Sequence, residues 1–222
     1  FGCDGIAGIE FDNFTMTEYI CNIALGFIMF YGGFNTKWKT ARPVAVKAVL
    51  LSTCGVILTA AFTMLFCYFV LRFPIAESFL VGAVLSATDA ASVFAILRRK
   101  KLNLKDGVAS LLEIESGSND PIAYMLTVIG IYILNGDNLI KVPYVIFAQI
   151  VYGVLIGIGL AVAAIYVLTR TDIIVNGLDT IFILAVVLLG LGLSQLVGGN
   201  EFLCIYLFGI LLGNSRIRNK GN

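Results

Sequence analysis

The stretch Pro143-Tyr-Val-Ile-Phe-Ala-Gln-Ile-Val-Tyr-Gly-Val-Leu-Ile-Gly-Ile-Gly-Leu-Ala-Val-Ala-Ala-Ile-Tyr-Val-Leu168 decides the fold class, because it contains no charged residue. A helix needs about 20 predominantly apolar residues to cross roughly 30 Å of hydrocarbon, and this stretch is long enough. Of the 222 residues in the chain, 59% are hydrophobic and only 13% are charged, whereas a soluble domain is about half apolar and about a quarter charged. We therefore predict an all-α membrane protein, a polytopic helical bundle that has membrane lipid as a partner.

Similar apolar runs recur along the chain and predict about seven spans. The expected helices cover residues 17–35, 43–71, 77–97, 107–134, 143–168, 177–197 and 201–214. The last is short enough for an interfacial or re-entrant segment, so the distribution of charge has to decide whether it crosses. Two glycine pairs, Gly153 with Gly157 and Gly209 with Gly213, have the spacing that allows helices to approach closely.

Basic residues are unevenly distributed between the expected loops. If all the segments cross, the loops and tail on one side contain Lys37, Lys39, Arg42, Arg98, Arg99, Lys100, Lys101, Lys105, Arg170, Arg216, Arg218 and Lys220. The loops on the other side contain only Arg72 and Lys141. Cytoplasmic loops carry the excess of Lys and Arg, so we expect a cell-membrane protein with its N-terminus outside and its C-terminus in the cytoplasm. We interpret the basic run 98–101 as a topology signal in preference to a lipid-headgroup site.

Several functions are excluded by what the chain lacks. It has no histidine, which removes Ser-His-Asp chemistry, ordinary haem ligation and most zinc sites. The cysteines are scattered without a CxxC spacing and are interpreted as small apolar residues: Cys3, Cys21, Cys54, Cys67 and Cys204. The net charge of +1 gives no reason to expect nucleic acid as a partner, and we predict no cofactor. Because the chain begins at Phe1 without an initiator Met, we expect an internal fragment.

Acidic residues inside the expected spans are the main functional signal. Asp89, Glu113, Glu115 and Asp120 fall within the third and fourth expected helices, and no basic residue of the expected spans is placed to neutralise them. A carboxylate near the bilayer centre costs at least about 2.5 kcal/mol, and such residues normally line a water-filled site or an ion path. These residues therefore predict an ion site between two neighbouring helices.

The stretch Glu113-Ile-Glu-Ser-Gly-Ser-Asn-Asp-Pro121 puts one polar stripe on the fourth helix. Helical spacing places Glu115 beside Asn119, and Ser116 beside Asp120. Carboxylate, hydroxyl and amide oxygens are hard ligands, and they suit Na⁺ or K⁺.

Proline and serine residues affect the same region. Pro121 cannot donate to the carbonyl of Gly117, so we expect a kink that exposes backbone oxygen beside the preceding aspartate. The hydroxyl groups of Ser86, Ser92 and Ser118 are interpreted as bonded to carbonyls of their own helices.

These motifs resemble the NhaP-type branch of the monovalent cation/proton antiporters, a family of sodium/proton and potassium/proton exchangers. The resemblance is carried by Thr88-Asp89-Ala90-Ala91-Ser92 and by the stretch 113–121, with support from Gly32-Gly33 and from the segments 8–13 and 211–219. It covers essentially the whole chain. The similarity is strongest to potassium/proton members, many of which also have Thr-Asp-Ala where others have Thr-Asp-Pro.

The resemblance implies an ion-binding site. Asn119 and Asp120 correspond to the Asn-Asp pair of the family, whose aspartate binds cation and proton alternately. Thr88 and Asp89 correspond to a Thr-Asp pair that lines the site in an unwound helix. Ser116 corresponds to a serine that can contact the ion. Na⁺ or K⁺ is therefore expected at Asp120 and Asp89.

The resemblance also implies features of the whole protein. Glu115 corresponds to a glutamate that forms a structural ion pair with an arginine of a later helix, beyond residue 222. Many relatives have an acidic residue where this chain has Tyr31. The family fold has two inverted repeats with discontinuous helices and is often homodimeric, so residues 1–222 would be a partial exchanger domain with the first repeat and the start of the second.

From these residues we expect secondary active antiport of K⁺ or Na⁺ against protons, which is the work of a transporter and not of an enzyme. Burial favours the neutral form of a carboxyl group and a bound cation favours its charged form, so the two ions compete for Asp120. A passive cation channel is the first alternative. A weaker one is an intramembrane aspartyl protease that uses Asp89 and Asp120, although the sequence frames typical of such proteases are absent.

Overall fold

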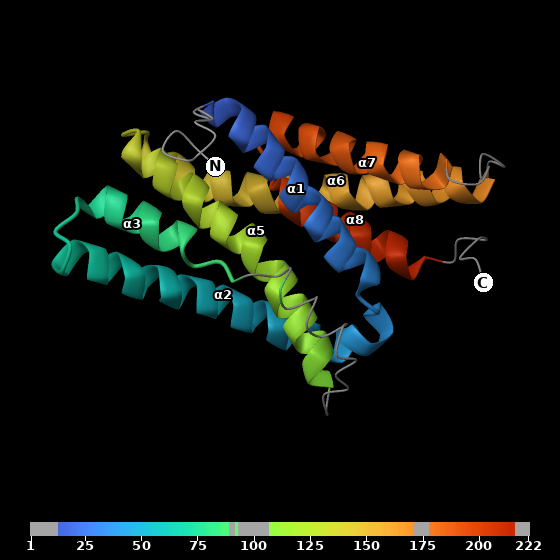
Figure 1. Ribbon diagram of the computed structural model, residues 1–222, viewed down its shortest axis with the longest axis horizontal. Coiled ribbons are helices and arrows are strands. Elements are labelled where there is room, and N and C mark those ends of the chain that lie inside the picture. The colour runs from blue at the N-terminus through green and yellow to red at the C-terminus, as the bar shows by residue number, and fades with distance from the viewer. Residues whose placement is uncertain (1–12, 89–91, 93–106, 171–177, 216–222) are drawn as a thin grey trace, which may run out of the picture.

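The chain is mainly helical in the computed structural model, which describes residues 13–88, 92, 107–170 and 178–215 (Figure 1). The elements are α1 (Phe14–Asn35), α2 (Trp38–Phe69), α3 (Ile75–Val84), α5 (Val108–Leu134), the 3₁₀ turn η2 (Leu139–Lys141), α6 (Val142–Arg170), α7 (Leu178–Leu196) and α8 (Glu201–Asn214). These described residues contain no β-strand. The predicted all-α class is confirmed.

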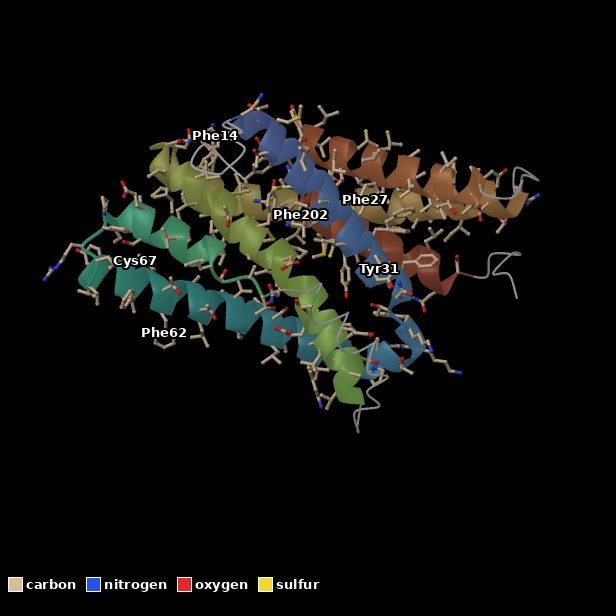
Figure 2. The ribbon with its side chains drawn as sticks, in the orientation of Figure 1. Phe14, Phe27, Tyr31, Phe62, Cys67 and Phe202 are labelled. Atoms are coloured by element: carbon tan, nitrogen blue, oxygen red, sulfur yellow. The ribbon has the colours of Figure 1, made fainter. Side chains whose placement is uncertain are left out.

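Four of the described helices are long and apolar enough to cross a membrane: α1, α2, η2 together with α6, and α7. Helices α3 and α8 are apolar but shorter, and α5 carries Glu113, Glu115 and Asp120 within its length. The outer surface of the bundle is also apolar. Phe62, for example, points away from α2 and is 69% exposed (Figure 2). Hydrocarbon can solvate such a surface, as expected of a membrane protein.

The helices form two groups that meet at α5 (Figure 1). Helices α2, α3 and α5 pack extensively on one another. Helices α1, α6 and α7 pack around α8 as a second group, and α1 crosses over α8 in the view of Figure 1. The contacts of α5 with the second group are less extensive than the contacts inside either group. The boundary between the groups is therefore the less tightly packed part of the described bundle.

The helices around α8 approach it at glycines. The predicted pairs Gly153 with Gly157 and Gly209 with Gly213 all face the backbone of a neighbouring helix. A Cβ atom added at Gly157, for example, would lie 2.6 Å from the carbonyl oxygen of Cys204. The close helix contacts predicted from this spacing are therefore present, and only glycine allows these backbones to come so near.

The third predicted helix, expected over 77–97, is interrupted. Helix α3 ends at Val84, and Ala87 and Thr88 are not helical, whereas Ser92 is helical again; the rest of the range, 89–91 and 93–97, lies outside the described residues. The backbone N–H of Thr88 donates to the side-chain oxygen of Asn119 at 3.2 Å and makes no bond to its own helix. A tertiary hydrogen bond, which sequence periodicity does not reveal, has replaced a helical one. The other predicted spans coincide with observed helices, apart from small shifts at their ends.

Candidate ion-binding site

A pocket of about 430 Å³ lies where the two helix groups meet. Side chains from α1, α5, α8, the end of α3 and the segment after it line the pocket, and its polar members are Thr88, Asp120, Tyr124 and Thr127. Phe202 of α8 forms part of the wall, and it lies between α1 and α5 in the view of Figure 2. Asp120 is the only carboxylate among the described residues of the lining. Two of the predicted site residues, Thr88 and Asp120, thus share one pocket.

Asn119 joins the two elements on which this pocket depends. Its side chain is 1% exposed. The side-chain oxygen of Asn119 accepts from the backbone N–H of Thr88 at 3.2 Å. The side-chain nitrogen of Asn119 donates to the hydroxyl oxygen of Thr88. A non-helical backbone needs such partners, because its N–H groups have lost their helical acceptors. Asn119 therefore holds Thr88 beside Asp120, and the non-helical backbone implied by the family resemblance is observed at Thr88.

The predicted polar stripe on α5 is present. Glu115 lies one turn before Asn119 on the same face of α5, and the two side chains interact. Ser116 is fully buried, and its hydroxyl oxygen has no hydrogen-bond partner among the described residues. A buried hydroxyl group without a partner is costly, so Ser116 is suited to an ion or a water molecule. The ion-pair role of Glu115 stays a prediction.

Other hydroxyl groups near the pocket are bonded to backbone carbonyls three or four residues before them in the chain. Ser86 donates to the carbonyl of Ala83 at 2.6 Å, and Thr127 donates to the carbonyl of Ala123 at 2.9 Å. The self-bonding predicted for Ser86 is thereby confirmed. Both hydroxyl groups donate their hydrogen to a backbone carbonyl, whereas the hydroxyl group of Ser116 has no hydrogen-bond partner among the described residues.

The donors that the structure describes include no multi-carboxylate centre. Asp89 lies outside the described residues, so its role stays a prediction. Among the described residues, no group of three or more His, Cys, Asp and Glu side chains could hold a metal ion. The described cysteines are free: Cys21, Cys54, Cys67 and Cys204. What the pocket offers a cation is one carboxylate together with neutral oxygen atoms.

Sequence reasoning placed the start of α8 correctly but missed the burial of its first residues, Asn200 and Glu201. Asn200 is fully buried and donates to the carbonyl oxygen of Pro121 at 2.8 Å, while α5 continues as a helix through this proline. Glu201, at the first position of α8, is only 2% exposed. A usable signal was the length of α8: its 14 residues rise about 21 Å, less than the roughly 30 Å of hydrocarbon, so an end lies within the membrane.

The chain matches the family described as sodium/hydrogen exchanger, transmembrane, over residues 2–221. It is 35% identical over 223 residues to the K(+)/H(+) antiporter NhaP2 of Shewanella sp. (strain ANA-3), with 99% of this chain and 38% of the relative covered. It is 34% identical over 218 residues to the K(+)/H(+) antiporter NhaP of Alkalimonas amylolytica, with 97% and 38% covered.

A more distant relative is the probable Na(+)/H(+) antiporter 2 of Methanocaldococcus jannaschii, which is 27% identical over 143 residues. That alignment covers 64% of this chain and 33% of the relative. The chain thus spans less than two fifths of the length of these curated relatives, since the two bacterial alignments each cover 38% of the relative.

Proposed function

This chain belongs to the sodium/hydrogen exchanger family, and we propose that it contributes the ion-binding site of an antiporter that exchanges a monovalent cation for protons. Relatives that carry the names of K(+)/H(+) and Na(+)/H(+) antiporters support the proposal. The observation that carries it is the position of Asp120, in a pocket between two helix groups and next to Thr88.

The chemistry of exchange follows from having one carboxylate in that pocket. The walls are mainly apolar, which favours a protonated Asp120, whereas a bound cation favours the ionised form. Proton and cation therefore exclude one another at the same oxygen atoms. Asn119 fixes the position of Thr88, whose hydroxyl oxygen can serve as a second ligand. Ser116 and Asp89 complete the proposed set.

The boundary between the two helix groups is where the site can open to each side in turn. Helices α5 and α8 are joined there by the hydrogen bond from Asn200 to Pro121 and by less extensive packing than within each group. Relative movement of the groups requires fewer contacts to break at this boundary than elsewhere in the described bundle. Alternating access at Asp120 is the mechanism that we propose.

Three further features of the whole protein are proposed on the family resemblance and the charge pattern. We expect a multi-pass protein of the cell membrane, with residue 14 near the outer face and residue 214 near the cytoplasm. We expect a homodimer, and we expect membrane lipid around the exposed apolar surface. Cysteine-accessibility labelling in intact cells tests the orientation, and cross-linking in membranes tests the dimer.

Transport by the complete reading frame that encodes this chain tests the proposal. The purified protein is reconstituted in vesicles with a trapped pH-sensitive dye, a pH gradient is imposed, and K⁺, Na⁺ or Li⁺ is added. We expect a saturable movement of protons that Asp120→Asn abolishes, because an amide cannot exchange a proton for a cation. Asp89→Asn is expected to impair exchange severely. Exchange by Asp120→Asn at the wild-type rate, corrected for the amount of protein incorporated, refutes the assignment.

Two controls separate the alternatives. Movement of the cation against its own gradient, driven only by the pH gradient, excludes a passive channel. Cleavage of a transmembrane reporter by the purified protein would favour the protease, and we expect none.

A further inference from the structure

Glu201 is a buried acidic residue that the proposed ion site does not use. Its side chain is 2% exposed, and its Oε1 atom has no hydrogen-bond partner among the described residues. The one described charge that acts on it is the carboxylate of Glu18 on α1, which has the same sign. An acidic residue inside a membrane bundle without a countercharge is costly and normally serves ion or proton movement.

Glu201 lies close to the proposed site. Asn200, the residue before it, donates to the carbonyl oxygen of Pro121, which directly follows Asp120. Phe202, the residue after it, lines the pocket that contains Asp120. The chain neighbours of the two acidic residues are thus in direct contact on α5 and α8.

Two opposing effects act on this carboxyl group. Burial in an apolar environment disfavours its charge, whereas the positive end of the α8 dipole favours it, since Glu201 lies in the first turn. The helix end is well formed, because the side chain of Asn200 accepts from the N–H of Leu203 at 2.9 Å. A carboxyl group under both effects can bind and release a proton in place.

The surroundings suit a proton better than a metal ion. The described titratable groups that interact with Glu201 are Glu18 on α1, Tyr124 on α5 and Cys204 on α8. No titratable side chain of α6 or α7 is among these partners. Tyr124 packs edge-on against Phe202, with ring centroids 5.0 Å apart, so much of this environment is aromatic. A metal ion needs several oxygen ligands, but a proton needs one.

We propose that, while the site is open towards the Phe14 end of α1, Glu201 accepts the proton that leaves Asp120 when the cation binds from that side, and that it passes this proton towards Glu18 on α1. This inference rests on the proposed function. In the step, the O–H bond of Asp120 breaks and an O–H bond forms at Oε1 of Glu201 through intervening water. Glu18 is exposed, so it can exchange the proton with the surroundings.

The test is Glu201→Gln in the complete protein, reconstituted as above, with the exchange rate measured across a range of pH. We expect the pH of half-maximal exchange to move by about one unit or more, because the amide cannot titrate. The cation concentration for half-maximal rate stays unchanged. Glu201→Asp keeps a titratable group and restores the pH dependence. The matched control is Glu77→Gln, at an exposed glutamate in the first turn of α3, which leaves the profile unchanged.

A pH profile of Glu201→Gln that superimposes on the wild-type profile overturns the inference. If Asp120→Asn abolishes exchange in the same preparation, only this inference fails; if Asp120→Asn is active, the proposed function fails too. If Glu201→Gln does not fold, a second measurement on the unmodified protein still tests the proposal. A hydrophobic carbodiimide, which labels protonated carboxyl groups in apolar surroundings, should label Glu201 less as pH rises. Labelling of Glu201 that does not change with pH contradicts the proposal.

Discussion

The group around α8 and the group of α2, α3 and α5 are held together in different ways. Around α8, large side chains such as Phe202, Ile205 and Phe208 are fully buried between helices that meet at glycines. On the other side, the buried residues of α2 are mostly small, and the segment after α3 is held at Thr88 by polar bonds to Asn119. Apolar packing therefore stabilises the group around α8, whereas hydrogen bonds shape the ion site. Substitutions should therefore separate stability from transport.

The largest effect on transport, after loss of the aspartate itself, is expected from Asn119→Ala. Without the amide, Thr88 loses both of its hydrogen bonds, and a displacement of about 1 Å can lower a rate about a hundredfold. Stability should fall by only about 1 kcal/mol, since water can replace these bonds. Exchange and thermal unfolding of the same preparation measure both quantities. Asn135→Ala, at an exposed residue just beyond the end of α5, is the control. Equal losses in both variants would contradict the positioning role.

The opposite behaviour is expected from Gly157→Ala in the group around α8. The added Cβ would lie 2.6 Å from the carbonyl oxygen of Cys204, and overpacking of this kind costs about 1–3 kcal/mol. Gly159, on the same helix, has no atom within 4 Å of an added Cβ. In detergent, the midpoint temperature of thermal unfolding should be lower for Gly157→Ala than for the wild type. The midpoint of Gly159→Ala should equal that of the wild type. Equal stability of the two variants would show that the close approach of α6 and α8 is not required.

A smaller effect is expected from Ser116→Ala. Its buried hydroxyl group has no hydrogen-bond partner among the described residues, so its removal should change stability by less than about 0.5 kcal/mol. If the hydroxyl is an ion ligand, the cation concentration for half-maximal exchange rises about fivefold, or roughly 1 kcal/mol. Ser86→Ala removes only a bond within a turn and should leave this concentration unchanged. Identical cation dependence in the two variants would remove Ser116 from the site.

The smallest effect is expected from Lys100→Gln. We interpret the basic run that contains Lys100 as a signal for membrane topology, and one substitution leaves most of that charge in place. Exchange by the variant should equal that of the wild type. A large loss would show that this basic run takes part in transport.

The elements of the fold were predictable where the signal is local. Apolar runs located the helices well, and the glycine spacing located close contacts, because each depends on residues a few positions apart. The end of α3 at Val84 was not predictable from composition or periodicity, since the hydrogen bond from Thr88 to Asn119 connects residues far apart in sequence. Only the family resemblance indicated non-helical backbone there.

The candidate site was predictable in part for the same reason. Asp120, Asn119 and Ser116 lie on one helix, so helical spacing related them correctly. The burial of Glu201 was missed because an acidic residue at the start of an apolar segment is usually exposed at a span end. Its burial depends on the packing of α1, α5 and α8, which a single sequence does not specify.

The measurement that tests the central claim most directly is proton release on cation binding. The complete protein, purified in detergent and held in weakly buffered solution, is mixed with K⁺ or Na⁺ while the pH is recorded. Competition at Asp120 predicts the release of up to about one proton per site, saturating with cation concentration. The Asp120→Asn variant should release none. Equal proton release by wild type and variant, or cation binding by the wild type without release, would contradict competition at this carboxylate.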